Sequence, residues 1–316
     1  FARYMVQEVM SSTQHYDGLH VVEIGAGNGV LAKNVLDWVQ RHHPTLYPST
    51  FYQCVDISPQ LHLRQRESLH AHELQGRASC WNLDGSRELP AFPSHLKCKN
   101  PLTVVLLMEV LDNLPHDLLQ LSGGQWNQGM VNLQDRCLTF HPLQDPLLLE
   151  WMFEGGGESA LEGSHQGLLQ VVKGALERVF SGGQVHFYAP TVAYLLLKNV
   201  LQSFPQAAVI VADFDQFAGS IPGQNGPVVQ RKRGGKTTVL DSILQFDEPC
   251  DIMFPSNFGS LGDTIQLLRP CQVEIMKQGA FLQQWAEIAR AQTRGKYNPL
   301  VDDYANMSVL IAKPMV

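Results

Sequence analysis

The sequence predicts an α/β fold built on a Rossmann-like, mainly parallel sheet, and three stretches carry that prediction. Val21–Leu31 (VVEIGAGNGVL) is a short apolar strand that runs into three glycines and then into a helical pattern. Phe51–Pro59 (FYQCVDISP) is a second strand, which ends in an acid. Pro101–Leu107 (PLTVVLL) is a continuous apolar run, typical of a central strand buried on both faces. Strands separated by helical crossovers indicate a parallel sheet.

Composition limits the classes of protein to which the chain can belong. Its 316 residues suit one large domain or two modest ones, and a hydrophobic content of 44% supports a sizeable core. The net charge of −7 argues against broad, nonspecific binding to nucleic acid, which needs a basic surface. The sequence contains no apolar run of about eighteen residues, the length expected of a membrane span.

Cysteine and histidine spacing predicts no metal site. The 6 cysteines form no C-x-x-C pair, and the 12 histidines are scattered without the spacing of a helical metal pair. We therefore expect reduced thiols in a reducing compartment. The chain begins with Phe1 instead of Met, so we expect the natural protein to extend further upstream, where a targeting segment would lie.

The glycine turn is the first candidate site. Gly25, Gly27 and Gly29 follow the first strand with G-x-G-x-G spacing, one residue shorter than the dinucleotide fingerprint. Glycine reaches backbone angles that a Cβ forbids and lets the main chain approach a ligand closely. A plain connecting loop between strand and helix is the alternative.

A second candidate is Asp56, at the end of the second predicted strand. A carboxylate there is where a Rossmann-like fold holds the ribose hydroxyls of a nucleoside. Its two oxygens can accept both hydroxyl protons. An ordinary loop or N-cap aspartate is the alternative, since Pro59 opens the next helix.

The acid Glu23 on the first strand, followed by G-x-G-x-G, resembles motif I of the class I S-adenosylmethionine-dependent methyltransferases. The resemblance implies a seven-stranded sheet, with the glycine turn beneath the amino-acid part of the cofactor and Glu23 holding its amino group. It also implies that an acid after the third strand, here Asp84, meets the adenine. A turn aspartate before Gly85 is an equally good interpretation.

Two acids follow the central strand, in the stretch Met108–Asp117 (MEVLDNLPHD). Glu109 and Asp112 lie at the carboxyl end of a parallel strand, where open α/β sheets bind their ligands. Asp112 is also placed to cap a helix that we expect to begin near Leu114, with Pro115 in its first turn.

The stretch EVLDNLPHD, together with the C-terminal stretches CDIMFPSNF and NPLVDDYANMSVLIA, resembles the MidA family (DUF185), which includes the NDUFAF7 group of mitochondrial proteins. The resemblance covers nearly the whole chain. It implies a mitochondrial matrix protein that uses S-adenosylmethionine to methylate an arginine on a partner during complex assembly, and that can form a homo- or heterodimer. Glu109 and Asp112 would then orient the guanidinium, which carboxylates bind bidentately.

The domain organisation that we expect has three parts. Residues 1–120 form the cofactor-binding half of the core, 121–188 an insert with a hairpin and helices that faces the substrate or partner, and 189–316 the second half of the core. Within these parts we expect helices over 1–10, 58–74, 145–180, 190–204 and 277–292 and from 257, with strands over 77–81, 207–214, 251–254 and 308–313.

A basic run stands out within the loop that we expect over 220–236. Its charged residues are Arg231, Lys232, Arg233 and Lys236. A solvated loop is the favoured interpretation, and contact with RNA phosphates or an acidic partner is the alternative.

Two other functions are compatible with the sequence. The first is an assembly factor with weak or no activity that keeps the methyltransferase fold and binds a mitochondrial ribosome or a respiratory-complex intermediate. The second is an RNA methyltransferase, for which Asn113-Leu114-Pro115 is only a partial motif and no basic face is evident.

Overall fold

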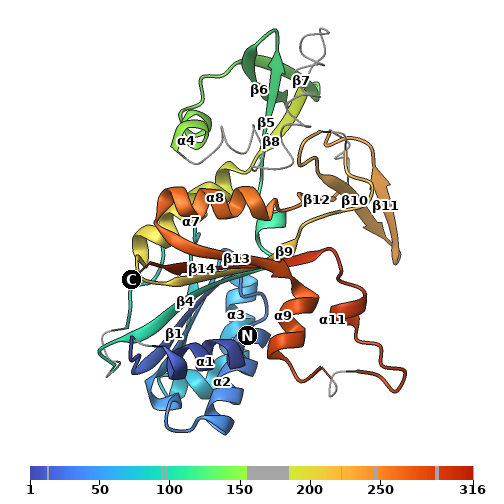
Figure 1. Ribbon diagram of the computed structural model, residues 1–316. Helices are drawn as coiled ribbons and strands as arrows, with labels where there is room; N and C mark the ends of the chain where they lie inside the picture. Colours follow the sequence, from blue (N-terminus) through green and yellow to red (C-terminus); the bar gives the residue numbers. More distant parts are fainter. Residues whose placement is uncertain are drawn as a thin grey trace. The chain divides into compact units, whose positions relative to one another are not determined.

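The computed structural model of the protein describes residues 1–12, 14–93, 96, 98–154, 185–221, 223–244, 248–288 and 292–315. The chain divides into two units (Figure 1). The first unit consists of Phe1–Val110, Leu196–Asp213 and Arg269–Val316. The second consists of Leu111–Leu195 and Phe214–Leu268, and so takes in both the predicted insert 121–188 and a later segment.

A seven-stranded sheet forms the centre of the first unit, in the order β13-β14-β9-β4-β1-β2-β3. Neighbouring strands from β9 to β3 pair in parallel, whereas β13 and β14 are antiparallel. Numbered by themselves in chain order, the strands read 6-7-5-4-1-2-3, so the predicted class I methyltransferase-like sheet is confirmed. Its strands are β1 (Gly18–Ile24), β2 (Thr50–Asp56), β3 (Ala78–Asn82), β4 (Pro101–Met108), β9 (Ala208–Phe214), β13 (Cys271–Lys277) and β14 (Met307–Pro314).

Local sequence explains how the first crossovers form. Every residue of β1 and of β2 is buried, as expected for parallel strands with both faces covered. The Ser58 hydroxyl caps α3 by accepting a hydrogen bond from the Leu61 amide at 3.3 Å, and Pro59 takes the first helical position. The helices of this unit are α1 (Ala2–Ser11), α2 (Val30–His42), α3 (Pro59–Leu74), the last turns of α7 (Thr191–Ser203), α9 (Gln278–Trp285) and α11 (Pro299–Asp302), with a 3₁₀ turn η1 (Tyr47–Ser49).

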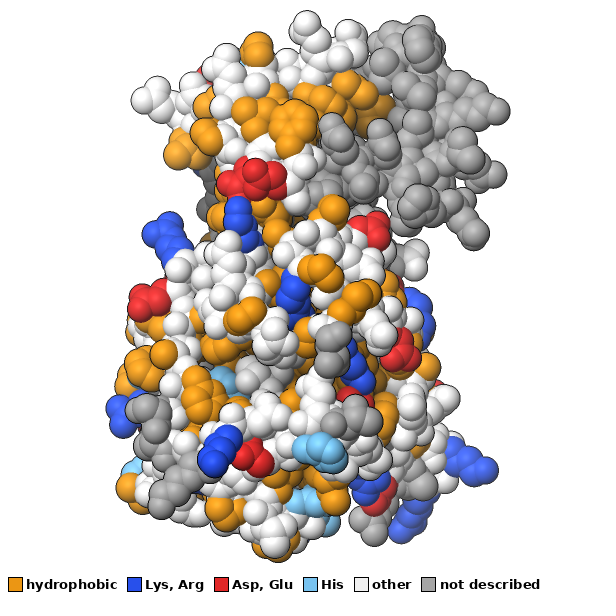
Figure 2. Space-filling model, turned by 60° about the vertical axis from the view of Figure 1, so that its left-hand side comes forward, with side chains coloured by type: hydrophobic (Ala, Val, Ile, Leu, Met, Phe, Trp, Pro, Cys, Tyr) orange, Lys and Arg blue, Asp and Glu red, His pale blue; other side chains and the backbone are white. Residues whose placement is uncertain are grey.

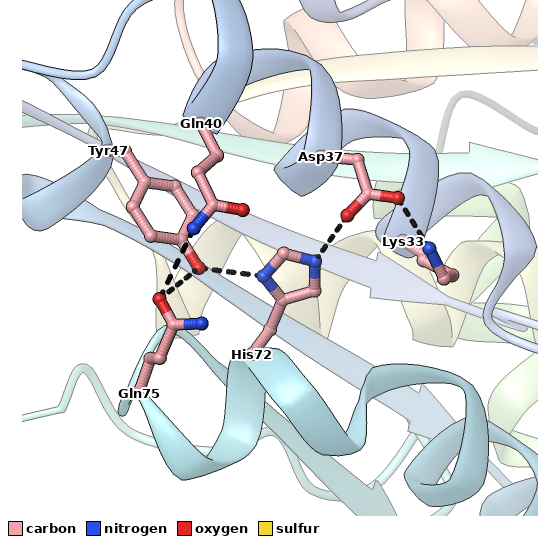
Figure 3. A network of polar contacts seen from close by, with 6 residues as sticks. All are labelled: Lys33, Asp37, Gln40, Tyr47, His72 and Gln75. Carbon is pink, nitrogen blue, oxygen red and sulfur yellow. Dashed lines mark hydrogen bonds and ion pairs between the residues drawn. The ribbon is translucent and has the colours of Figure 1, made fainter.

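A polar network joins α2 to α3 (Figure 3). His72 is buried on α3, with its Nδ1 atom 2.7 Å from the Tyr47 hydroxyl and its Nε2 atom 2.9 Å from Asp37 Oδ1 on α2. Asp37 is in turn paired with Lys33, and Tyr47 donates to Gln75 at 3.2 Å. The helices α2 and α3, which follow β1 and β2, are therefore held together by polar contacts as well as by packing.

The second unit contains two small antiparallel sheets. One has the order β7-β6-β5-β8 and the other β11-β10-β12. The core of the first sheet includes Leu119, Trp151 and Phe187, all buried. The elements are η2 (Leu111–Asn113), β5 (Asp117–Ser122), β6 (Gln125–Asn132), β7 (Cys137–Pro142), α4 (Pro146–Glu154), β8 (Val185–Ala189), the first turn of α7, β10 (Val228–Arg233), β11 (Lys236–Leu240), β12 (Asp251–Met253) and α8 (Phe258–Leu268).

Several predicted elements are right. The helices over 1–10, 58–74 and 190–204 correspond to α1, α3 and α7, and the strands over 207–214 and 308–313 correspond to β9 and β14. The predicted hairpin is confirmed as β6–β7, within a sheet of four strands. Of the helix predicted over 145–180, α4 is present, whereas residues 155–180 lie outside the described residues.

Three predictions need correction. The helix expected to begin near Leu114 does not form, because the described chain there makes the short η2 turn and then pairs as β5 with β8. The strand predicted over 251–254 is present as β12, but it pairs with β10 in a small sheet and not in the core; the sixth strand of the large sheet is β13, which was not predicted. Of the helix predicted over 277–292, α9 is present and ends at Trp285, whereas residues 289–291 lie outside the described residues.

The predicted solvated loop over 220–236 is also wrong, because its basic end is part of the β10–β11 hairpin. Gly234 and Gly235 have φ values of 56° and 78°, as the two-residue turn of a tight hairpin requires. Arg231 and Arg233 pair with Glu248 at 3.2 and 3.4 Å. The sequence Arg-Gly-Gly-Lys therefore builds a hairpin tip and is not a free basic tail.

Candidate functional site

The glycine turn joins β1 to α2. Gly25, Gly27 and Gly29 all have positive φ values, of 71°, 53° and 73°. The turn is tied to β2, because the Gly25 amide donates to the Val55 carbonyl at 2.8 Å. A Cβ on Gly25 would lie 2.6 Å from Val110 Cγ2, so a side chain is excluded there by contact as well as by conformation.

Gly27 differs from its neighbours in what surrounds it. A Cβ built there would have no protein atom within 4 Å among the described residues. Packing therefore does not demand glycine at this position, whereas the positive φ and the open space beside it are what a ligand-cradling turn provides.

Glu23 lies on β1, two residues before the turn, and is only 3% exposed. Its Oε2 atom accepts a hydrogen bond from the Tyr52 hydroxyl at 2.9 Å. Burial raises the pKa of this carboxyl to about 7, the charge of Asp56 adds to the rise, and the bond from Tyr52 opposes it. Such a carboxylate is stabilised in its charged form by a cation brought next to it, as the amino group of the cofactor would be.

Asp56 ends β2 and is 7% exposed. Its Oδ1 atom accepts from the Ser58 amide at 2.9 Å, while Oδ2 accepts from the Gly27 amide at 3.2 Å and from Gln65 Nε2 at 3.3 Å. A carboxylate oxygen has two lone-pair sites, so Oδ1 keeps the capacity to accept from a ligand hydroxyl. Asp56 thus joins the glycine turn to the second strand, and this brings together two groups that the sequence placed 29 residues apart.

Gln65 is a member of this cluster that the sequence interpretation missed. It lies on α3 with no exposed surface and donates from Nε2 to the Gly27 carbonyl at 2.9 Å as well as to Asp56. A glutamine nine residues beyond Asp56 falls on the helix face that looks back at the strand end, but nothing in its local pattern marks it.

Asp84 is used in a turn. Its Oδ1 atom accepts from the Ser86 amide at 3.0 Å and from the Ser86 hydroxyl at 2.7 Å, and Oδ2 lies 3.4 Å from Arg87 Nε. The next residue, Gly85, packs closely against Ile24 at the end of β1. Asp84 is therefore a turn aspartate, as the alternative interpretation expected, and its turn lies beside the end of β1.

Glu109 follows β4 directly and is exposed. Its φ is 54°, and its amide donates to the Ala212 carbonyl on β9 at 2.8 Å. Because β4 pairs with β1 with Leu107 opposite Ile24, Glu109 comes at the same edge of the sheet as the glycine turn. A non-glycine residue in the left-handed region is uncommon, and such strain concentrates at functional sites.

Asp112 lies in η2 and is 1% exposed. Its Oδ1 atom accepts from the Asn113 side-chain amide at 2.6 Å, and its carbonyl accepts from the Phe254 amide at 2.8 Å. The two acids of the motif therefore differ: the structure exposes Glu109 to solvent and encloses Asp112.

These features fit S-adenosylmethionine. A buried acid suits the amino group of the amino-acid part, and an acid at the end of the second strand suits the ribose. The open space beside Gly27 leaves room for the chain that joins these two parts.

Comparisons with known proteins identify the family and the fold. The family model described as "Putative S-adenosyl-L-methionine-dependent methyltransferase" matches residues 1–275. A curated relative from Schizosaccharomyces pombe, named "Protein arginine methyltransferase NDUFAF7 homolog, mitochondrial", is 22% identical over an alignment of 291 positions that covers 85% of this chain. The chain spans 60% of the length of that relative.

Solved structures reproduce the fold. A protein from Burkholderia thailandensis, described as a "likely methyl transferase" and bound to S-adenosylhomocysteine, matches 99% of this chain and 74% of its own with a TM-score of 0.62 at 17% identity. A native structure of an uncharacterised protein from the same organism matches with a TM-score of 0.64 at 17% identity over 99% and 77% of the two chains. With a family match over most of its length, the chain belongs to the MidA family, whose fold is that of the class I methyltransferases and whose cofactor is S-adenosylmethionine.

Proposed function

We propose that the protein transfers a methyl group from S-adenosylmethionine to an arginine side chain of a partner protein, as a step in the assembly of a mitochondrial complex. The observation that carries the proposal is the row of groups at one sheet edge. Glu23, the glycine turn and Asp56 follow β1 and β2, and Glu109 follows the paired strand β4.

The protein's own residues would act by binding and orienting. When bound, the cofactor supplies an electrophilic methyl group on a sulfonium. Glu23 would hold its amino group, Asp56 its ribose hydroxyls, and the turn after β3 that contains Asp84 would meet its adenine. Displacement at a sulfonium needs little acid–base chemistry, so placing the attacking nitrogen in line supplies most of the rate enhancement.

Glu109 is the residue that we assign to the arginine. An exposed carboxylate can take a guanidinium bidentately and localise its charge away from the attacking nitrogen. Asp112, the other catalytic candidate, is enclosed, so we assign it to fixing the segment that follows Glu109. It would then be a positioning residue.

The partner class rests on the relative and on the second unit. The relative's name states protein arginine methylation and a mitochondrial location. Figure 2 shows apolar side chains gathered on one face of the second unit, over the region of α4 and the four-stranded sheet. The large apolar side chains that this unit exposes include Met130, Leu133 and Phe153. We propose that this unit meets the partner, or a second subunit, as exposed apolar patches often do.

The basic hairpin gives a second possible contact of the second unit. Arg231 and Arg233 share Glu248, while Lys236 directly follows the two-residue turn and Lys232 pairs with Thr237. We propose that this tip meets an acidic protein surface or RNA.

Among the described residues, no helix is both long and apolar enough to cross a membrane.

An assembly factor without turnover is the competing function, and the enclosed Asp112 favours it, because a catalytic acid normally reaches its substrate. Isothermal titration with S-adenosylmethionine and with S-adenosylhomocysteine, followed by methyl transfer to copurifying proteins, separates the two. We expect micromolar binding of both compounds, and product that disappears in Glu109→Gln while cofactor binding persists.

A second variant, Gly27→Val, tests the location of the cofactor site. Gly27→Val places a branched side chain at a positive φ, in the open space proposed for the cofactor, and should abolish binding. Binding without product in the parent protein would favour the assembly factor. Full binding by a folded Gly27→Val variant would refute the site.

A further inference from the structure

Gln65 connects the two halves of the proposed cofactor site. Its Nε2 atom lies 2.9 Å from the Gly27 carbonyl and 3.3 Å from Asp56 Oδ2, and the Gly27 amide lies 3.2 Å from the same Oδ2 atom. The three residues therefore close a ring of hydrogen bonds between the turn after β1, the end of β2 and the middle of α3.

The chemistry of the ring calls for a primary amide. The Gly27 carbonyl and the Asp56 carboxylate are both acceptors, and a glutamine NH₂ group brings one N–H to each. A carboxylate at position 65 would offer no donor and would add a second negative charge beside Asp56, whereas an apolar side chain would leave the turn carbonyl without this partner.

The helix backbone is close enough to make the contact specific. A Cβ on Gly29 would lie 3.2 Å from Gln65 Cα, so α3 packs directly against the turn. The residue before Gln65 makes a second contact with the glycine turn, because Arg64 Nη1 lies 3.3 Å from Asn28 Oδ1. The middle of α3 thus forms a support beneath the glycine turn.

Gln65 also carries a cost that packing does not explain. Its Oε1 atom is buried and finds no hydrogen-bond donor among the described residues. A buried acceptor left in this state is destabilising. An apolar residue of similar size would remove that cost but would leave the Gly27 carbonyl and Asp56 Oδ2 without this donor, so what the amide contributes is the link between the turn and Asp56.

We infer that Gln65 is a positioning residue for the cofactor: it sets the distance between the glycine turn and Asp56, and so the fit of the amino-acid and ribose parts of S-adenosylmethionine. The inference rests on the proposed cofactor site. It assigns Gln65 to cofactor affinity and not to methyl transfer.

The test uses the full chain, with S-adenosylhomocysteine as the probe in isothermal titration. Gln65→Met keeps the volume and removes both donors, and Gln65→Glu keeps the shape and replaces the donors by charge. We expect Kd to rise about tenfold in Gln65→Met, the effect of losing about one net hydrogen bond, and at least as much in Gln65→Glu. The melting temperature of unliganded Gln65→Met should fall by about as much as that of the Gln278→Met control described below, so a rise in Kd seen only in Gln65→Met is not a general loss of stability.

A matched control separates this effect from the general loss of a buried glutamine. Gln278, on α9, is 8% exposed and donates to the Leu300 carbonyl at 3.3 Å. Gln278→Met should leave Kd unchanged. A similar rise in Kd for Gln278→Met and Gln65→Met, or a Kd within twofold of the parent for both Gln65 variants, would overturn the inference.

Hydrogen exchange of the unliganded protein gives a readout that does not depend on the proposed function. The peptide that covers the glycine turn should exchange faster in Gln65→Met, with the rest of the first unit unchanged. If the parent protein does not bind S-adenosylhomocysteine, the proposed function fails, and this measurement still decides whether Gln65 holds the turn. Unchanged exchange in the turn would refute that.

Discussion

At the scale of single residues, we propose that the protonation of Glu23 depends on whether the cofactor is bound. The carboxyl is buried on β1 beside the Tyr52 hydroxyl, and burial brings its pKa from 4.5 to about 7. The folded protein therefore keeps a proton in this pH range that the unfolded chain has released. A cofactor ammonium would reverse the balance, because it stabilises the carboxylate.

The first prediction is a pH dependence with a definite sign. Because the folded state binds the extra proton, stability should fall as pH rises from 4.5 to about 7, by up to about 3 kcal/mol in total. Affinity for S-adenosylhomocysteine should rise over the same range, with proton release on binding below pH 7. Titration calorimetry in buffers of different ionisation enthalpy measures that release.

Glu23→Gln is the control for this prediction. The variant has no carboxyl to titrate, so both the fall in stability and the proton release should disappear. The same pH dependence in the variant would assign the effect to another group.

The second prediction concerns the backbone of Glu109. A side chain at φ 54° costs roughly 1–2 kcal/mol, which glycine avoids, although glycine loses more entropy on folding. Glu109→Gly should therefore be as stable as the parent or more stable by up to about 1 kcal/mol, while losing methyl transfer. Chemical denaturation and a transfer assay measure the two effects.

Glu109→Ala keeps the strain and removes the carboxylate, and so is the matched variant. It should lose transfer without the gain in stability. Transfer retained in both variants would remove Glu109 from the proposed site, and a Glu109→Gly variant less stable than Glu109→Ala would refute the strain argument.

Local pattern was enough to find some of these residues and not others. Glu23, the glycines and Asp56 could be found because each lies at the end of a strand whose pattern is visible in the sequence. Gln65 could not, because its partners Gly27 and Asp56 meet it only after α3 folds back on the sheet. The enclosure of Asp112 is likewise a tertiary effect, set by contacts such as the bond to Phe254.

At the scale of elements, the edge of the large sheet was the hardest part to predict. β13 pairs with β14 through residues 31 to 43 positions apart, and α9 begins directly after β13 without a loop. Several residues of β13 are exposed, so this strand lacks the continuous apolar pattern that marked β4. The apolar stretch at Asp251 was the stronger local signal, although it forms the edge of a different sheet.

The third prediction concerns the β10–β11 hairpin. Gly235 has a φ of 78° in the two-residue turn, so Gly235→Ala should destabilise the hairpin by about 1 kcal/mol. Hydrogen exchange over β10 and β11 should become faster, while cofactor affinity is unchanged. Gly295→Ala is the control, since Gly295 has no positive φ and meets no atom closer than 3.9 Å.

An unchanged exchange rate in Gly235→Ala would contradict the tight turn. It would favour the solvated basic loop expected from the sequence, in which a change of one glycine has little effect.

At the scale of the whole molecule, the residues proposed to bind the cofactor and those proposed to meet a partner fall on different units. The candidate cofactor groups and Glu109 belong to the first unit, whereas the basic hairpin and the exposed apolar side chains of α4 and the β6–β7 hairpin belong to the second. The second unit is built from two separated segments, Leu111–Leu195 and Phe214–Leu268. The predicted insert over 121–188 accounts for part of the first segment only, and the second segment was predicted to belong to the core.

The fourth prediction follows from this division. Differential scanning calorimetry should show two transitions, of which S-adenosylhomocysteine shifts only that of the first unit. At about one hundred times Kd the ligand contributes about 2.7 kcal/mol, which corresponds to about 5 to 10 °C for a unit of this size. Gly27→Val should keep both transitions and lose the shift, because it removes the binding without altering the second unit. One transition that shifts as a whole would show that the units unfold together, and a shift confined to the second unit would place the cofactor away from β1 and β2.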